Sequence, residues 1–419
     1  RPAAVLGHLL LETDRGRRPG LLDDGPVLLA CDARLTDRAR LAEALELPAG
    51  QASRDDGALI LAAWQRWGPA CPERLHGVFA FCLLDEAHRR IFCARDRIGV
   101  KPFAYRLAPD RFVFASEARA VAAEAGGLPL APLAVADYLL GREAVDFTGT
   151  FFRDVLRLPP AHGLEITPER VRLRRYWAPE PRELPSDDPR EIVEALSEAL
   201  DRSVRRHGSA SGVDACLLSG GLDSATVLGR MPAGTLACSA VSEREDCGDS
   251  AAIRSFPGRT AETSLRCVLE RPEDWLPSVL PVQSRLATPF ASVMTLAAAL
   301  YRGAAARGVR VVLDGVEGDL VFSLFADYPR LLLAEGRWRD GLGELLHLGR
   351  EGHAQSIAVT LPRLLLGRLQ PPALARFRHG RRDERLQAAQ LAYPLLSRAL
   401  RGSASLREHL LYVDFRLTR

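Results

Sequence analysis

A short run of glycines, serines and one aspartate is the part of this chain best suited to chemistry. It follows an apolar stretch, 213–218, that predicts a buried strand, and it precedes 225–228, which predicts the first turn of a helix. A glycine-rich turn between strand and helix presents backbone N–H groups and a helix N-terminus to a phosphate. A carboxylate beside a phosphate needs a cation between them, so the run also predicts Mg²⁺. The predicted phosphate-binding residues of this run are Ser219, Gly220, Gly221, Leu222, Asp223 and Ser224.

Two interpretations of this run compete. It is not a Walker A loop, because the Gly-x-x-x-x-Gly-Lys-Ser/Thr pattern does not occur there. The order Ser-Gly-Gly-x-Asp-Ser after a strand resembles the pyrophosphate loop of N-type ATP pyrophosphatases, which cleave ATP to AMP and pyrophosphate while adenylating a substrate. The alternative is an ordinary glycine-rich turn. The strand, both serines and the aspartate together favour the first interpretation.

A second group of carboxylates follows another predicted strand, 309–313. The run Asp314–Asp319 holds three carboxylates and two glycines within six residues. Crowding three carboxylates is costly unless a cation compensates their charge. We therefore expect Asp319 to supply a second carboxylate for the Mg²⁺ that Asp223 binds. The alternative is a solvated acidic turn.

The elements that must position these two runs alternate between strands and helices. Apolar residues at helical spacing predict a helix over 190–207, and another helix is expected over 290–307. This alternation predicts a parallel α/β sheet, whose ligands bind at the carboxyl ends of the strands, where both Ser219 and Asp314 lie. The predicted strands of this sheet are 213–218, 235–241 and 309–313.

The first part of the chain has a different pattern. Residues 1–178 contain short alternating runs that predict strands, with helices between them, and this predicts an α+β sandwich. A stretch rich in Pro, Glu and Asp, 179–189, is interpreted as a linker, so that the second domain covers 190–419. The strands are expected at 27–30, 78–84, 91–94, 111–115 and 163–167, and the helices at 56–67 and 133–140.

The composition argues against several classes of partner. A net charge of +3 among 26% charged residues gives no reason to expect nucleic acid, and no apolar run is long enough to cross a membrane. The eight cysteines show no C-x-x-C spacing, and Cys82 and Cys216 lie in apolar runs. We therefore expect small buried thiols in a reducing cytoplasm rather than disulfides or a zinc site. Lys101 is the only lysine, so a step that needs a lysine has one candidate.

Across nearly its whole length the chain resembles the asparagine synthetase-like enzymes. Its first part is similar to their class II glutamine amidotransferase domain. Its second part is similar to their synthetase domain, in which the loop falls at Ser219–Ser224 and the second Mg²⁺ motif at Asp314–Asp319. The resemblance implies an αββα sandwich followed by a parallel-sheet α/β ATP-pyrophosphatase domain of the adenine nucleotide alpha hydrolase-like type. The matching runs of the first part are Leu6-Gly7-His8, 75–81, 94–105, 114–117, 158–162 and Tyr176-Trp177.

Departures from the family pattern imply that the amidotransferase-like domain, 1–178, is not an active glutaminase. A glutaminase of this class uses an N-terminal cysteine, and the match at Leu6-Gly7-His8 implies that this position precedes Arg1, so a cysteine there stays open. The family's glutamine-binding arginine, its Asn-Gly pair and its acidic residue correspond to Leu10, Asp32-Ala33 and Ala58. We therefore expect a relic that is kept for structure or for substrate binding.

A member of this family without glutaminase activity must use another amine. β-Lactam and carbapenam synthetases close a ring within a small amino acid. Lasso-peptide cyclases adenylate an Asp or Glu side chain of a precursor peptide, whose N-terminal amine then closes a macrolactam. The runs Cys31–Leu35 and Cys93–Asp96 look most like the cyclases.

That resemblance implies ATP and Mg²⁺ as cofactors, a precursor peptide as substrate, and a leader peptidase and a leader-binding protein as further partners. Two alternatives stay open. One is a small-molecule asparagine or β-lactam synthetase, and the other is a non-catalytic nucleotide-binding scaffold.

The resemblance also assigns roles to individual residues. Asp223 and Asp319 would hold Mg²⁺. Glu317 is the candidate for acid/base catalysis, because the family's glutamate or tyrosine position falls on its neighbour Val316; the alternative is that Glu317 only supports the metal site. The family's C-terminal lysine has no counterpart, so the synthetase domain, 190–419, is expected to be incomplete. The strand ends expected against adenine are near Leu217 and Val241.

Overall fold

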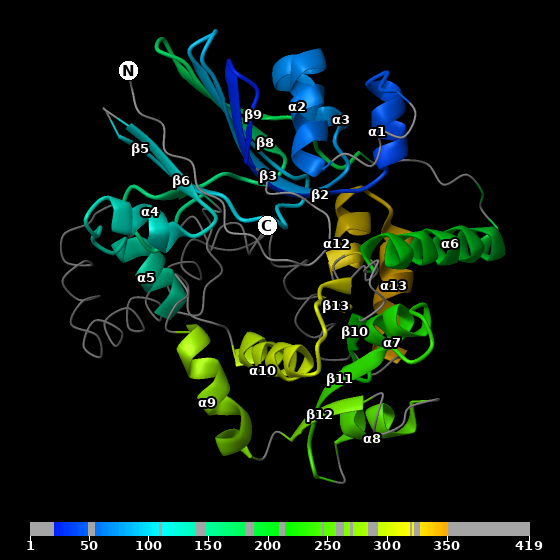
Figure 1. Cartoon of the computed structure of the whole chain (residues 1–419). Helices are drawn as coiled ribbons and strands as arrows, with labels where there is room; N and C mark the ends of the chain where they lie inside the picture. The colour runs from blue at the N-terminus through cyan, green and yellow to red at the C-terminus, as the bar shows by residue number, and fades with distance from the viewer. Residues whose placement is uncertain are drawn as a thin grey trace, which may run out of the picture. The chain divides into compact units, whose positions relative to one another are not determined.

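The computed structural model divides the chain into two compact units, 1–129 with 147–316 and 130–146 with 317–419. Figure 1 labels their helices and strands. The structure describes residues 21–48, 55–108, 111–139, 148–180, 186, 188–208, 214–244, 247–256, 264–268, 271–283, 292–318, 321 and 327–350.

Two antiparallel sheets form the first part of the larger unit. The six-stranded sheet has the order β1-β2-β3-β4-β8-β9, and the three-stranded sheet has the order β6-β5-β7. In the large sheet, β2 and β3 pair from Val27 opposite Asp85 to Leu35 opposite Gly77. The strands are β1 (Leu21–Asp23), β2 (Val27–Leu35), β3 (Gly77–Asp85), β4 (Arg90–Arg95), β5 (Ala104–Ala108), β6 (Arg111–Ala115), β7 (Leu156–Arg157), β8 (His162–Ile166) and β9 (Val171–Arg175).

Helices cover the outer faces of these two sheets. The large sheet packs against helices over a core that contains the fully buried Leu59 and Phe79. The small sheet packs against a helix through Val121. Between the sheets lies a third cluster, with Cys82 and Phe103 on opposite sides. The layers therefore confirm the predicted αββα sandwich. The helices are α1 (Arg38–Ala44), α2 (Asp56–Trp67), the 3₁₀ turn η2 (Gly68–Ala70), α3 (Cys71–Arg74) and α4 (Ala118–Glu124).

A four-stranded parallel sheet follows in the same unit, with the order β12-β11-β10-β13. The helices α6, α7 and α8 pack on one face of it and α10 packs on the other, each over its own apolar cluster. This confirms the predicted parallel α/β sheet. The elements are α6 (Pro189–His207), β10 (Asp214–Leu217), α7 (Leu222–Gly229), β11 (Leu236–Val241), α8 (Gly248–Ser255), β12 (Ser264–Val268), α9 (Pro272–Gln283), α10 (Ser292–Ala306) and β13 (Val311–Leu313).

The smaller unit contains three described helices, α5 (Pro132–Leu139), α12 (Asp327–Ala334) and α13 (Trp338–Arg350). The turn between α12 and α13 is closed by Arg337 N, which donates to Leu332 O at 2.9 Å. Leu332 and Leu345 are buried within this pair of helices. Asp319 and Leu10, together with residues 351–419, lie outside the described residues, as does most of the expected linker 179–189.

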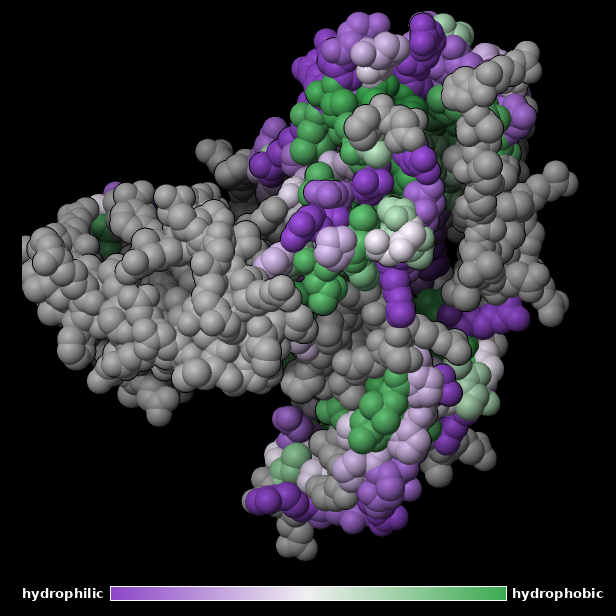
Figure 2. All heavy atoms as spheres, turned by 90° about the vertical axis from the view of Figure 1, so that its left-hand side faces the viewer, coloured by the Kyte–Doolittle hydropathy of each residue, from purple (hydrophilic) through white to green (hydrophobic). Residues whose placement is uncertain are grey.

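All eight cysteines lie among the described residues and are free thiols, six of them buried. This agrees with the expectation of apolar packing rather than a disulfide framework. Within the ranges that the structure describes, the helices are too short or too polar to cross a bilayer. On the face shown in Figure 2, apolar residues form separate patches among hydrophilic ones.

Candidate functional site

The parallel sheet reverses its strand order at β10. From β10 the chain passes to β11 and β12 on one side, and it then returns across the opposite face through α10 to β13 on the other side. In open α/β sheets the ligand crevice lies at such a reversal, outside the carboxyl ends of the strands. The loop Leu218–Gly221 leaves β10 at this edge, and Asp314 leaves β13 there. Both predicted runs therefore start at one topological switch point.

The loop after β10 leads directly into the N-terminus of α7. Gly221 is the N-cap residue, and no side chain caps the first N–H groups of the helix. The first intrahelical bond is donated by Ala225 N to Gly221 O at 3.1 Å. Ser219 and Gly221 are exposed, as is Leu222, which is 86% exposed. The uncapped amides of the first turn are thus available to an anion.

Ser224 holds the loop together from beneath. Its hydroxyl donates to Gly221 O at 3.1 Å and accepts from Ser219 N at 3.1 Å, and its Oγ lies 3.1 Å from Ser219 Oγ. Ser224 is only 6% exposed. The two serines of the motif therefore differ in role, because Ser224 shapes the loop while the exposed Ser219 can reach a ligand.

Gly220 lets the loop pass close to the start of α8. Its φ of 85° lies in the left-handed region, and a Cβ there would come within 2.8 Å of Asp249 O. Only glycine fits that combination without strain. The backbone near the strand end is therefore open on its outer side and closely packed on its inner side.

The second loop lies directly against the first. A Cβ on Gly315 would come within 2.7 Å of Ser224 N and 2.9 Å of Asp223 Cβ. Backbone therefore packs on backbone at this point, and Asp223 in the first turn of α7 lies beside the start of the acidic run. The structure brings together Asp223 and Gly315, which are far apart in the sequence.

Asp314 is fixed by two hydrogen bonds. Tyr301 of α10 donates its hydroxyl to Asp314 Oδ2 at 3.2 Å, and Val316 N donates to Oδ1 at 3.2 Å. Burial and the neighbouring Asp314 carboxylate raise the pKa of Tyr301 to about 12, so it remains a neutral donor. Tyr301 could not be predicted, because no motif surrounds it in the sequence. It reaches the acidic loop because α10 packs on the sheet that contains β13.

The structure does not bring together those remaining predicted site residues that it describes. Leu217 packs against the cluster on the α10 face of the sheet, whereas Val241 is buried in the cluster on the α7 and α8 face. Their side chains are therefore not brought together, and a base at this edge would meet these strands through their backbone. Glu317 is exposed, with a φ of 63°. Asp319 lies outside the described residues, and among those that are described no three His, Cys, Asp or Glu side chains cluster as metal ligands.

The described residues fit a magnesium–polyphosphate group. Uncapped amides at the N-terminus of α7 suit phosphate oxygens, and the Asp223 carboxylate in the same turn suits a hard cation between itself and the phosphates. Gly221 is exposed, and a Cβ there would meet only Ser219 Oγ, at 3.4 Å, so a ligand can approach the backbone at this position. The arrangement can therefore bind a nucleoside triphosphate at the carboxyl ends of β10 and β13.

In the amidotransferase-like domain, the positions expected to bind glutamine hold other interactions. Asp32 in β2 forms an ion pair with the only lysine, Lys101, at 2.6 Å between Oδ1 and Nζ. Ala58 lies in the first turn of α2, and its N–H donates to the capping Asp55 Oδ1 at 2.8 Å. Neither described position offers an arginine, Ala58 has no carboxylate, and the carboxylate of Asp32 is paired with Lys101.

One run that carries the resemblance has a structural role. Arg95 donates to the carbonyls of Lys101, Leu158 and Gly99 at 2.6, 2.8 and 2.6 Å. The carboxylate of Asp96 is fully buried and accepts four backbone N–H groups, the shortest from Lys101 at 2.9 Å. Burial lowers the pKa of Arg95, and Asp96 opposes that effect. This run fixes the turn that presents Lys101 to Asp32.

Two family models match the chain. The model of the glutamine amidotransferase domain covers residues 4–177, and the model of asparagine synthase covers residues 195–416. The second covers more than half of the chain. The chain therefore belongs to the asparagine synthetase-like family, with an amidotransferase-like sandwich before the synthetase domain.

Curated relatives agree with this family. The chain is 32% identical to asparagine synthetase [glutamine-hydrolyzing] 3 of Bacillus subtilis over 41% of its own length, and 26% identical to putative asparagine synthetase [glutamine-hydrolyzing] 2 of Methanocaldococcus jannaschii over 50%. It is 30% identical to amidase chry2 of Gibberella zeae over 54%. These matches span 28%, 41% and 34% of the three relatives, so the chain covers less than half of each.

Among solved structures, the chain is similar to glutamine phosphoribosylpyrophosphate amidotransferase of Bacillus subtilis, at 17% identity. The similarity covers 53% of this chain and 48% of the other. Its TM-score is 0.27, too low to support any assignment of residues.

Proposed function

We propose that this chain is an ATP-dependent amide-forming ligase that activates a carboxylate as an acyl-adenylate and releases AMP and pyrophosphate. The observation that carries the proposal is the contact of Gly315 with Asp223 and Ser224 at the switch point of the sheet. It places an uncapped helix N-terminus and the first residues of the acidic run side by side. A phosphate loop and a carboxylate are the two parts that phosphoryl chemistry on ATP needs.

Each part has a proposed task. Ser219 and the amides from Gly220 to Asp223 bind the β- and γ-phosphates, while Asp223 and Asp319 bind Mg²⁺. The metal would supply positive charge that stabilises the leaving pyrophosphate. Tyr301 orients Asp314 and so supports the second loop. Glu317 is proposed as the acid/base group for amide formation, or as a carboxylate that supports the metal site.

The finer proposal is that the carboxylate belongs to a precursor peptide. The enzyme would adenylate an Asp or Glu side chain, and the N-terminal amine of the same peptide would displace AMP to close a macrolactam. The bond that forms is the amide, and the bond that breaks joins the acyl carbon to the AMP oxygen; the amine's proton leaves to a base. Much of the rate would come from holding amine and acyl carbon together. A leader peptidase and a leader-binding protein are proposed as further partners.

The Asp32–Lys101 ion pair supports this finer proposal. By the family resemblance, Asp32 falls at the position of a glutaminase's Asn-Gly pair and Ala58 at that of its acid; Asp32 is paired with Lys101, and the Ala58 N–H donates to Asp55. An enzyme without a glutamine site must take its amine from elsewhere, and the peptide's own N-terminus is one such source. Asparagine formation is the second candidate, because curated relatives carry the name asparagine synthetase.

Mass spectrometry distinguishes the two candidates. The enzyme is incubated with ATP, Mg²⁺ and the precursor peptide encoded beside its gene, and pyrophosphate is assayed in parallel. The cyclase proposal predicts a peptide lighter by one water, with matching AMP and pyrophosphate. Pyrophosphate release with aspartate and an amine donor, and an unchanged peptide, would replace it by the second candidate.

A further inference from the structure

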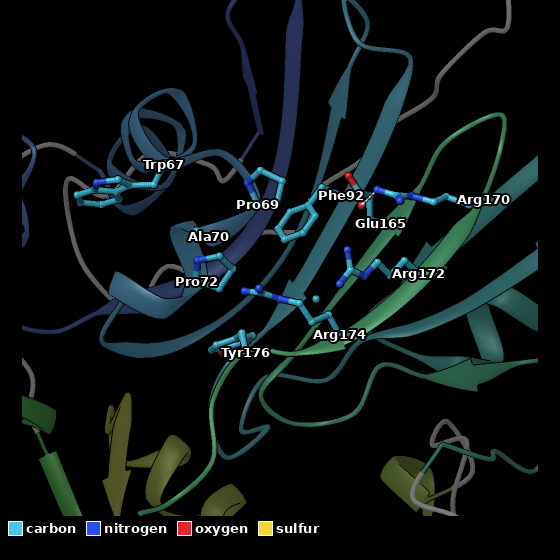
Figure 3. A pocket seen from close by; sticks show the side chains of 11 residues that line it. Trp67, Pro69, Ala70, Pro72, Phe92, Glu165, Arg170, Arg172, Arg174 and Tyr176 are labelled. Carbon is cyan, nitrogen blue, oxygen red and sulfur yellow. Dashed lines mark hydrogen bonds and ion pairs between the residues drawn. The ribbon is translucent and has the colours of Figure 1, made fainter.

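A hollow of about 340 Å³ lies on the helical face of the large antiparallel sheet, away from the parallel sheet's switch point. Figure 3 shows its lining. Trp67, Pro69 and Pro72, at the end of α2 and the start of α3, form one wall. Phe92 of β4 lies at its floor, and Arg172 and Arg174 of β9 extend over it from the opposite side.

The hollow exists because the helical layer ends before the sheet does. The helices pack on β2, β3 and β4, whereas β8 and β9 extend beyond them. On this uncovered strip, Phe92 is opposite Glu165, and Glu165 is opposite Arg172. Gly163 of β8 leaves space beside the Phe92 ring, because a Cβ there would come within 3.1 Å of that ring.

The hollow carries an excess of positive charge. Arg170, Arg172 and Arg174 line it with a single acid, Glu165. Glu165 already binds Arg170 and Arg90, each at 3.4 Å, and Arg174 forms an ion pair with Glu73. Among the described residues, Arg172 has no ion pair or side-chain hydrogen bond. Its guanidinium is therefore available to a carboxylate, which it would bind in a charge-assisted hydrogen bond.

The strand β9, which carries Arg172 and Arg174, is one edge of the described sheet. β9 pairs only with β8 in the described sheet, and all five of its residues are exposed. Arg172 and Arg174 lie on the face of the hollow. Val171 and Leu173 lie on the other face, and they are 53% and 45% exposed. Arg175 shares this second face with the two apolar residues. An exposed edge strand with a basic face and alternating apolar residues is a template for pairing with a complementary strand.

We propose that β9 and this hollow bind an extended segment of a separate polypeptide in which acidic and apolar residues alternate. Its acidic side chains would meet Arg172 and Arg174, its apolar side chains would meet Val171 and Leu173, and its backbone would extend the sheet. A second copy of this chain does not fit, because pairing two β9 strands would bring arginine against arginine. This inference is independent of the ligase proposal.

Fluorescence anisotropy without ATP tests the proposal. The probe is a short fluorescein-labelled peptide of alternating glutamate and valine, added to the whole chain. Binding is expected to weaken with added salt, and to fall on the order of tenfold in the double variant Arg172→Gln, Arg174→Gln. The variant Arg202→Gln, an exposed arginine of α6, is the matched control and should bind like the wild type.

Two further peptides separate charge from strand pairing. A peptide with glutamine in place of glutamate should bind far more weakly. Of two acidic peptides methylated at alternate backbone nitrogens, one on each edge, only the peptide methylated on the edge that pairs with β9 should bind far more weakly. Equal binding of the glutamine peptide, or no effect of the double variant, would overturn the proposal. Equal binding of the two methylated peptides would overturn the pairing with β9. Because no turnover is measured, failure of the ligase proposal does not change these outcomes.

Discussion

Asp223 is the residue through which the two halves of the candidate site meet. Its backbone lies against Gly315, and it follows an N-cap that leaves the first amides of α7 without a side-chain partner. A carboxylate at a helix N-terminus beside a phosphate is useful only with a cation between the two groups. Its role can therefore be tested by removing its charge alone.

Asp223→Asn is expected to abolish pyrophosphate release while the far-ultraviolet circular dichroism and the unfolding midpoint stay close to those of the wild type. The amide keeps the size of the carboxylate and loses the charge that binds Mg²⁺. Asp154→Asn is the matched control, because Asp154 is exposed and its φ of 64° suits asparagine. Near-normal turnover of the Asp223 variant would show that the metal assignment is wrong.

Tyr301 gives the second loop a pH-dependent contribution to stability. Burial and Asp314 raise its pKa from 10.0 to about 12 in the folded chain. The unfolded chain therefore loses this proton first, so the contribution is complete below pH 10 and is lost as the pH rises toward 12. The difference in unfolding free energy between wild type and Tyr301→Phe should be constant up to pH 10 and shrink above it. Urea unfolding across that range measures it, and a constant difference at all pH values would refute the assignment.

At the scale of elements, the close approach of the loops after β10 and β13 depends on glycine. Gly315 lies against backbone, which cannot move aside as a flexible side chain can. Gly315→Ala is therefore expected to lower the unfolding free energy by about 1–3 kcal/mol through overpacking. By shifting the acidic loop, it should also slow pyrophosphate release on the order of a hundredfold.

Gly229→Ala is the control for this prediction. Gly229 ends α7, and a Cβ there would meet nothing within 4 Å. The control should be as stable as the wild type or slightly more stable, because alanine favours helix. Equal activity of both alanine variants would mean that the contact between the loops does not matter for the reaction.

The sequence predicts elements well where apolar residues repeat at a regular spacing and poorly where they do not. The helix expected at 56–67 is α2 (Asp56–Trp67), and the helix expected at 190–207 is α6, because both repeat apolar residues at helical spacing. The strands β9 and β12 were not expected. Each of them is an edge strand with arginine in it, so no apolar run or buried face marks it in the sequence.

The candidate site shows the same limit. The loop at Ser219–Ser224 could be predicted because its chemistry is contiguous in the sequence. The expected parallel sheet predicted that this loop and the acidic run lie at the same edge, but it did not predict the contact of Gly315 with Asp223. The hydrogen bond from Tyr301 and the separation of Leu217 from Val241 could not be predicted, because both depend on which helix packs on which face of the sheet. Asp319 lies outside the described residues, so its part in the site stays a prediction.

At the scale of the whole molecule, the chain combines an amidotransferase-like sandwich with a candidate ATP site. Asp32, which forms an ion pair with Lys101, is at a position that the family resemblance predicts for glutamine binding. We expect Asp32→Ala to leave amide formation unchanged with any amine the enzyme accepts. The cost in unfolding free energy should be below about 1 kcal/mol, because both side chains are partly exposed. An ammonia-release assay with glutamine tests whether the amidotransferase-like domain has lost glutaminase activity. Glutaminase activity that collapses in this variant would contradict that interpretation.

Isotope labelling tests most directly whether the enzyme adenylates a carboxylate. It follows one oxygen atom of that carboxylate into AMP. Adenylation requires a carboxylate oxygen of the substrate to attack the α-phosphorus of ATP, so that oxygen leaves with AMP when the amide forms. The enzyme is given ATP, Mg²⁺ and a precursor peptide whose Asp or Glu side-chain carboxylate carries heavy oxygen, and AMP is analysed by mass spectrometry. We expect one labelled oxygen in AMP for each cyclised peptide. Unlabelled AMP beside an amide product, or ADP as the nucleotide product, would contradict it.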